Sequence, residues 1–284
     1  MALFGSERDS RIYEAIKAYN EQAILQPQLV IDEVIASLRQ NNVAFTGERV
    51  VINDAVESQY RNVLEEHIAR YALACRLIKG MQVLDAACGT GYGAKMMEAA
   101  GAAYITGVDI SEESIAHARN DYGGDRISYL AGDVRSLPFA AASFDAVVSF
   151  ETIEHIPDGS VWIREAARVL KPKGLFIVST PNRGVTNAGL YYCEQPINRY
   201  HHFEYTVTEF SGELMKEFDL LELYGQTFVS DTLHAGVQFL RQIYHRNMQY
   251  MPKAMTAIAG HNLLPLGHIK NAQPAYVVAV CRKK

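Results

Sequence analysis

The stretch Val83–Gly93 reads VLDAACGTGYG, with three alternating glycines directly after a short apolar run. The run that begins at Gln82 predicts a strand, and residues 91–100 predict the helix that follows. Glycine lets the backbone turn tightly and lets a ligand approach without a Cβ in the way. The stretch therefore predicts a strand, a ligand-binding loop and a helix, although a tight turn without a ligand could use the same glycines.

The same alternation of helix and strand continues on both sides of the loop. Apolar residues from Tyr60 to Ile78 recur at three- and four-residue steps and predict a helix with one buried stripe. Glu66 and Arg70 on this helix form an i,i+4 pair that we expect at the surface. Further apolar runs predict strands at 104–108, 127–131, 146–150, 175–179, 220–228 and 275–281. Such alternation predicts a parallel sheet covered by helices on both faces.

Polar residues mark where several of these helices begin. Ser111 and Asp158 each stand where a side chain can cap a helix, and residues 206–209 fit a capping box. The segment 171–174, Lys-Pro-Lys-Gly, is expected to end one helix before the strand at 175–179.

Two regions lie outside the alternation. Residues 1–55 predict an N-terminal helical extension, and residues 56–284 predict the main domain. That domain carries inserts at about 183–208 and 229–272, the second of them helical and directly before the last strand. We expect the extension and the inserts to cap a second substrate, the acceptor, bound next to the ligand of the glycine loop. The same segments could instead form a homodimer interface.

Composition narrows the classes of function. The chain has 284 residues and a net charge of -5, from 27 basic and 32 acidic residues. A weakly acidic protein lacks the positive field that nucleic-acid binding usually needs, so no nucleic-acid partner is expected. The four cysteines form no CxxC pair and predict reduced, buried side chains. No stretch fits a signal peptide or a membrane span, so we expect a cytoplasmic protein without a membrane partner.

Three carboxylates flank the glycine loop. Asp109 ends the next strand, 20 residues after Gly89, where an acid can accept both ribose hydroxyls of a nucleotide or of an adenosyl group. Asp85 stands just before the loop, where it suits a cationic amino-acid end and would repel a pyrophosphate. Asp133 follows the third strand and can accept a hydrogen bond from an adenine amine. The loop also departs from G-x-G-x-x-G, because residue 94 is alanine.

Taken in order, these segments resemble class I methyltransferases that use S-adenosyl-L-methionine (SAM), and among them the subgroup acting on small molecules, sugars and natural products. The resemblance covers about residues 81–181. It rests on the loop and on the segments 107–111, 132–133, 144–155 and 168–174. It implies an α/β, Rossmann-like, seven-stranded and mostly parallel sheet whose last strand is antiparallel.

The resemblance also implies which residues bind SAM and release S-adenosyl-L-homocysteine. Ala87 and Gly89 would contact the methionine part through their backbone, Asp109 would hold the ribose, and Asp133 with Val134 would hold the adenine. The full set of expected cofactor contacts is Tyr60, Asp85, Ala87, Gly89, Gly91, Asp109, Ile110, Asp133, Val134 and Glu151. Tyr60 belongs to the set because the N-terminal extension could fold over the cofactor.

Four residues are candidates for the chemistry of transfer. His155 is the expected general base, because its unperturbed pKa lies near neutrality, although it could simply pack beside the cofactor. Glu151 could orient His155 or the substrate. One of His201 and His202 is expected to line the acceptor pocket while the other supports the loop. Adjacent histidines fit one metal ion poorly and no third ligand is marked, so no metal is predicted.

The sequence therefore predicts a SAM-dependent methyltransferase whose acceptor is a hydroxyl of a sugar or another secondary metabolite. The chain lacks the Asp-Pro-Pro-Tyr type of motif that some subgroups use to methylate amino groups of nucleic acid or protein. A small-molecule amine is the alternative acceptor. The alternatives of another class are a nicotinamide-dependent oxidoreductase and a SAM-binding module without catalysis.

Overall fold

The computed structural model describes Glu14 and residues 27–39, 52–188, 195–231 and 262–284. The chain divides into two compact units. Unit 1 comprises residues 1–149 and 168–174, and unit 2 comprises residues 150–167 and 175–284. Across the described segments, we find no helix with the length and hydropathy needed to cross a membrane.

Unit 1 is built on four parallel strands. They are β1 (Gln82–Ala86), β2 (Tyr104–Asp109), β3 (Ile127–Ala131) and β4 (Phe144–Ser149). Their order is β3-β2-β1-β4, so β1 lies between β2 and β4 with Leu84 opposite Thr106 on one side and Val147 on the other. The residues of β1 from Val83 onward are buried, as expected for an inner parallel strand.

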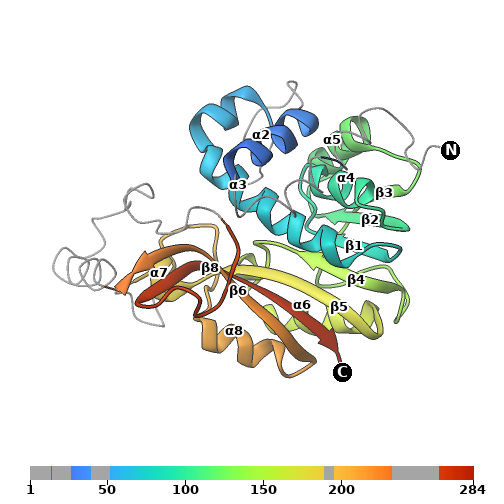
Figure 1. Cartoon of the computed structure of the whole chain (residues 1–284). Helices are drawn as coiled ribbons and strands as arrows, with labels where there is room; N and C mark the ends of the chain where they lie inside the picture. The colour runs from blue at the N-terminus through green and yellow to red at the C-terminus, as the bar shows by residue number, and fades with distance from the viewer. Residues whose placement is uncertain (1–13, 15–26, 40–51, 189–194, 232–261) are drawn as a thin grey trace. The chain divides into compact units, whose positions relative to one another are not determined.

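The helices of unit 1 are α2 (Pro27–Leu38), α3 (Asp54–Leu77), α4 (Tyr92–Ala99) and α5 (Glu112–Tyr122). Helix α4 packs between α3 and α5, next to the strands (Figure 1). Ser111 caps α5 as predicted, because its Oγ accepts a hydrogen bond from Ser114 N at 3.2 Å. Tyr122 at the end of α5 donates its hydroxyl to Leu38 O of α2 at 2.9 Å.

Helix α3 differs from the sequence prediction in two ways. Its backbone bends at Tyr60, where φ is -129° and ψ is 26°. Glu66 and Arg70 are each only 1% exposed, so the predicted surface pair is wrong. The reason is that α3 contacts α2 as well as α4, and its buried surface is therefore wider than the one apolar stripe.

The antiparallel strands lie mainly in unit 2. They are β5 (Leu170–Pro181), whose first five residues belong to unit 1, β6 (Phe218–Ser230), β7 (Leu264–Pro265) and β8 (Ala272–Lys283), in the order β5-β8-β6-β7. The last strand, β8, lies antiparallel to both β5 and β6, with Val178 opposite Ala279 and Tyr224 opposite Val278. Strand β5 begins directly after the preceding helix, so the Lys-Pro-Lys-Gly link lies inside the strand.

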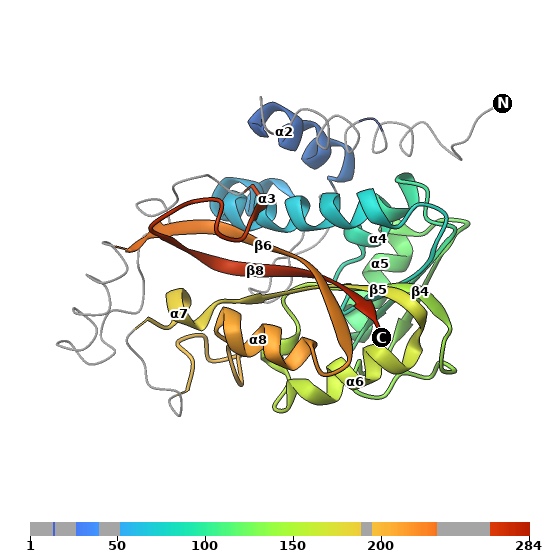
Figure 2. The same ribbon diagram turned by 60° about the horizontal axis from the view of Figure 1, so that its bottom comes forward.

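The helical elements of this part of the chain are η1, a 3₁₀ turn (Ile153–His155), α6 (Gly159–Val169), α7 (Arg183–Thr186) and α8 (Val207–Leu214). Helix α8 lies against β6 and α7 against β8 (Figure 2). The predicted caps are confirmed: Asp158 accepts from Ser160 N at 3.0 Å, and Thr206 with Glu209 forms the capping box. Trp162, Phe176 and Phe218 form an aromatic core, with ring centroids 5.9 and 5.1 Å apart.

The predicted fold class is confirmed: an α/β, Rossmann-like arrangement with parallel strands first and antiparallel strands last. The described strands number eight rather than seven because of the two-residue β7. Of the N-terminal extension 1–55, α2 is helical, and much of the rest lies outside the described residues. So does most of the insert 229–272, and the domain boundaries therefore stay predictions. Cys75, Cys88 and Cys281 are buried free thiols, as expected, and Cys193 lies outside the described residues.

Two helical glycines provide a test of the packing of α3 on α4. A Cβ added at Gly93 would lie 2.0 Å from Cζ of Tyr71, whereas a Cβ at Gly212 in α8 would meet nothing within 4 Å. We expect Gly93→Ala to lower the free energy of unfolding by about 1–3 kcal/mol, through overpacking. Gly212→Ala should raise it by about 0.5–1 kcal/mol, because alanine is the better helix former. Urea unfolding of both variants measures the difference, and equal effects would contradict the close contact.

Candidate functional site

The glycine loop between β1 and α4 has an unusual backbone. Ala87, Gly89 and Gly91 all have left-handed φ values, of 59°, 54° and 92°. A Cβ on Gly91 would lie 2.7 Å from Cβ of Ala118, so packing alone requires glycine there. A Cβ on Gly89 would meet nothing within 4 Å. Gly89 therefore faces open space, as a glycine beside a ligand would.

Asp109 ties the loop to the end of β2. Its Oδ2 accepts a hydrogen bond from Gly89 N at 2.9 Å, and its Oδ1 accepts one from Ser111 N at 2.9 Å. A carboxylate oxygen can accept more than one hydrogen bond, so these backbone contacts do not by themselves exclude ribose hydroxyls as further donors. The structure thus brings together Asp109 and Gly89, which the sequence placed 20 residues apart.

Asp85 is the most buried acid of the loop, with 1% of its surface exposed. Tyr71 Oη donates to its Oδ1 at 3.1 Å, while its Oδ2 has no hydrogen-bond partner among the described residues. Burial raises the pKa of Asp85 to about 7; the hydrogen bond from Tyr71 opposes this rise, and the charge of Asp109 adds to it. A cationic group next to Oδ2 would supply the missing partner and stabilise the charged form.

Tyr71 is a site residue that the sequence did not reveal. Its place in the apolar stripe of α3 indicated a core side chain. The ring is buried, but its hydroxyl reaches Asp85, because Gly93 leaves room for the ring against α4. Tyr92 packs edge-on against it, with centroids 5.5 Å apart. Sequence spacing alone gives no signal for this contact.

Asp133 has a different environment from the one expected. Arg135 binds both of its oxygens, with Nε at 3.0 and 2.9 Å and Nη2 at 2.5 Å from Oδ2. This hydrogen bonding lowers the pKa of Asp133, so the carboxylate is charged at neutral pH. Gly132 N donates to Asp109 O at 2.9 Å and so fixes Asp133 near the end of β2. The sequence did not single out Arg135.

The other predicted cofactor contacts of unit 1 vary in exposure. Val134 is buried, whereas Ile110 is 67% exposed. Tyr60 is 37% exposed and lies at the bend of α3. Glu151 belongs to unit 2, where Ser179 Oγ donates to its Oε1 at 2.7 Å.

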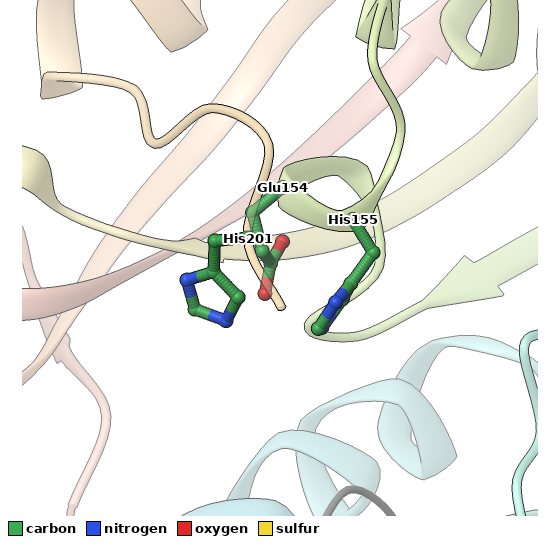
Figure 3. Close-up of side chains that lie close together, drawn as sticks. All are labelled: Glu154, His155 and His201. Carbon is green, nitrogen blue, oxygen red and sulfur yellow. The ribbon is translucent and has the colours of Figure 1, made fainter. Parts of the chain in front are cut away.

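Two of the four predicted catalytic residues, His155 and His201, lie together in unit 2 with Glu154; we call these three residues the histidine cluster. One nitrogen or oxygen atom from each lies within 4.8 Å of those of the other two. Figure 3 shows the Glu154 carboxylate between the two imidazoles. The rings of His155 and His201 lie edge to face, with centroids 4.8 Å apart. His155 Nδ1 lies 3.1 Å from Tyr200 O.

His201 has polar partners on both ring nitrogens. Nδ1 lies 2.6 Å from Oε1 of Glu204, which is buried, and Nε2 lies 2.9 Å from Nδ2 of Asn198. Because an amide nitrogen donates, Nε2 accepts and Nδ1 carries the hydrogen. His202 differs: its side chain is exposed, and its backbone N donates to Glu154 O at 2.8 Å. The structure therefore brings His201, but not the side chain of His202, to His155.

Glu154 is fully buried in the middle of this cluster. Thr180 Oγ1 donates to its Oε2 at 3.2 Å, whereas Oε1 has no hydrogen-bond partner in the described part of the chain. Burial, followed by the nearby charge of Glu151, raises the pKa of Glu154 well above its usual range. The sequence did not assign a role to Glu154 or Glu204, since neither lies in a periodic segment that would fix where its side chain points.

The raised pKa of Asp85 predicts a pH-dependent stability. The unfolded carboxyl ionises near 3.8 and the folded one at about 7. The stability that this group contributes is therefore complete below the lower value and is lost as the pH rises through about 7. We expect Asp85→Asn to gain stability over the ligand-free parent protein as the pH rises from about 5 to about 8. Calorimetric melting at several pH values tests this, with exposed Asp125→Asn as the control. A constant difference between Asp85→Asn and the parent would contradict it.

Comparison with known proteins assigns the family. Residues 84–178 match the family described as "Methyltransferase domain". A protein of Mycolicibacterium smegmatis named "Probable S-adenosylmethionine-dependent methyltransferase" is 37% identical over 188 residues, which are 66% of this chain and 66% of that protein. A ubiquinone biosynthesis O-methyltransferase of Azorhizobium caulinodans is 35% identical over 132 residues, 46% of this chain and 52% of the relative. The matched segment thus spans between half and two thirds of each relative.

Solved structures agree on the fold. A SAM-dependent methyltransferase of Mesorhizobium loti superposes with a TM-score of 0.52 and 19% identity, over 77% of this chain and all of that one. The likeness in structure runs well beyond residues 84–178, where the family match ends. Residues 84–178 therefore form a methyltransferase domain, and the described fold is that of the class I SAM-dependent methyltransferases.

Proposed function

We propose that the protein transfers a methyl group from SAM to a hydroxyl of a small molecule, such as a sugar or a secondary metabolite. The observation that carries the cofactor assignment is the buried Asp85, whose Oδ2 has no partner within the described segments, beside a loop that is open at Gly89. SAM carries an ammonium group and a sulfonium, and either cation could compensate a buried carboxylate. A pyrophosphate would instead be repelled by Asp85, which disfavours a nicotinamide dinucleotide.

Each loop residue then has a proposed role. Asp85 faces the amino-acid end of SAM, and the backbone of Ala87 and Gly89 contacts the methionine part. Asp109 accepts the ribose hydroxyls, and Asp133 with Val134 contacts the adenine. Because Arg135 already binds Asp133, the adenine amine would share that carboxylate with the guanidinium. These residues bind and orient the cofactor, and alignment with the acceptor supplies most of the acceleration.

The acceptor side is proposed to involve unit 2. A hydroxyl must lose its proton as it attacks the methyl carbon, which requires a group that favours this loss. The histidine cluster contains His155 and His201, and the carboxylate of Glu204 fixes the tautomer of the His201 imidazole. The relative named as an O-methyltransferase supports an oxygen acceptor. A free amine would attack without a base, so the cluster favours the hydroxyl over the amine.

Other features of the proposal follow from the sequence. We expect a cytoplasmic protein with a small-molecule partner and no nucleic acid or membrane partner. The extension 1–55 and the insert 229–272 are proposed to cap the acceptor or to join two copies of the chain. A SAM-binding module without catalysis would need no cluster of acids and histidines.

The role of Asp85 predicts a selective loss of affinity. We expect SAM to bind, and Asp85→Asn to weaken that binding at least about tenfold, because an ion pair with the SAM ammonium is lost. Methylthioadenosine has the adenosine but no amino acid, so its affinity should change less than about threefold. Titration calorimetry at about pH 8, where Asp85 is ionised, measures both ligands.

Asp125→Asn, an exposed carboxylate of unit 1, is the matched control and should bind both ligands like the parent protein. If Asp85→Asn weakened the two ligands equally, Asp85 would not face the amino-acid end. If the parent protein bound neither SAM nor S-adenosyl-L-homocysteine, the cofactor assignment would be wrong.

The proposed acceptor class predicts where the methyl group goes. With methyl-labelled SAM and a panel of sugars, phenols and primary amines, we expect the label in ethers. His201→Ala should lower kcat by a factor of about 10² to 10⁴ while the affinity for SAM stays within about threefold. The exposed His268→Ala is the control. If the label were found only in methylated amines, the proposal of a hydroxyl acceptor would be wrong. SAM binding without any methyl transfer would favour the non-catalytic module.

A further inference from the structure

We propose that the histidine cluster of Glu154, His155 and His201 binds one divalent transition-metal ion, such as zinc, manganese or cobalt. The three residues offer ligand atoms that all lie within 4.8 Å of one another. They point toward one another in Figure 3. Two imidazoles and one carboxylate are a common ligand set for first-row divalent ions. The sequence predicted no metal because the adjacent His201 and His202 fit one ion poorly and no third ligand was marked. The proposed site instead combines His201 with His155 and Glu154.

The surroundings of the two histidines fit ligands of a metal. A metal-bound histidine usually donates its other ring N–H to a carbonyl or a carboxylate, which fixes the ring. His155 Nδ1 lies 3.1 Å from Tyr200 O, and His201 Nδ1 lies 2.6 Å from Glu204 Oε1. If each Nδ1 keeps this contact, Nε2 of each ring is the nitrogen that would bind the ion. At His201 the ion would replace the amide of Asn198, which now lies 2.9 Å from Nε2.

The buried acids in and beside the cluster also favour a cation. Glu154 is fully buried, and its Oε1 lacks a hydrogen-bond partner among the residues described. Glu204 is 2% exposed and lies directly behind His201. Burying carboxylates without compensation is costly, and metal coordination is one of the few ways to offset that cost. A divalent ion would supply the missing partner of Glu154 Oε1.

The spacing requires only a small adjustment. Ligand atoms at about 2.1 Å from a tetrahedral ion lie roughly 3.4 Å apart. Side-chain rotations that move the ligand atoms by about 1 Å would therefore close the site. Three protein ligands leave a coordination position open, as in catalytic metal sites. If the function proposed above holds, an acceptor hydroxyl bound at that position would lose its proton more readily. The histidines would then act as ligands, and the ion would favour the loss of the proton.

Cobalt absorption tests the site without SAM or an acceptor. Full-length protein, freed of metal with a chelator, is titrated with Co²⁺ while the visible d–d bands are recorded. We expect one ion per chain and a rise in melting temperature on binding. Glu154→Gln and His201→Ala should each weaken the affinity at least about tenfold. Asn198→Ala should preserve or strengthen binding, because it frees His201 Nε2.

The matched control is His117→Ala, which removes another histidine that pairs with a carboxylate, at 2.7 Å from Asp121. It should leave the cobalt bands unchanged. Absence of bands in the parent protein, or bands that persist in both Glu154→Gln and His201→Ala, would overturn the proposal. Because the titration needs no methyl transfer, failure of the metal site and failure of the proposed reaction are separate outcomes. Circular dichroism checks that each variant is folded.

Discussion

The carboxylate of Asp85 is held out of water at the end of β1, directly before the glycine loop. A buried acid at this position needs a donor, and Tyr71 provides one through its hydroxyl. Tyr71 can approach only because Gly93 lacks a side chain. One buried carboxyl group therefore connects three elements: Tyr71 of α3, Asp85 near the end of β1 and Gly93 of α4. The other oxygen, Oδ2, has no hydrogen-bond partner in the described part of the chain and is the atom on which the proposed cofactor binding depends.

Buried carboxyl side chains have different roles in the two units. In unit 1, the two oxygens of Asp109 accept backbone N–H groups and so shape the loop. In unit 2, Glu204 holds His201 in one tautomer, while one oxygen of Glu154 has no hydrogen-bond partner in the part of the chain that the structure describes. The first arrangement fits binding and orientation of a cofactor, and the second fits proton transfer or metal coordination.

The sequence predicted the parts of the fold that depend on neighbouring residues. The strands of unit 1, the cap at Ser111 and the capping box at Thr206 all follow from local periodicity and hydrogen bonding. The contacts that the sequence missed join distant residues, such as Tyr71 with Asp85 and Glu154 with His201. The helical spacing of apolar residues predicted that Tyr71 is buried, but it could not predict which group its hydroxyl contacts. The two-residue β7 was missed because so short a strand has no alternation to detect.

The position of β8 in the chain affects how the protein must be made. This strand pairs with both β5 and β6, yet it comes after them in the sequence. While the ribosome has not yet released residues 272–283, the facing edges of β5 and β6 have no native partner. Such exposed edges invite pairing with other nascent chains. The yield of folded protein would then depend on how well chaperones cover these two edges until β8 has emerged.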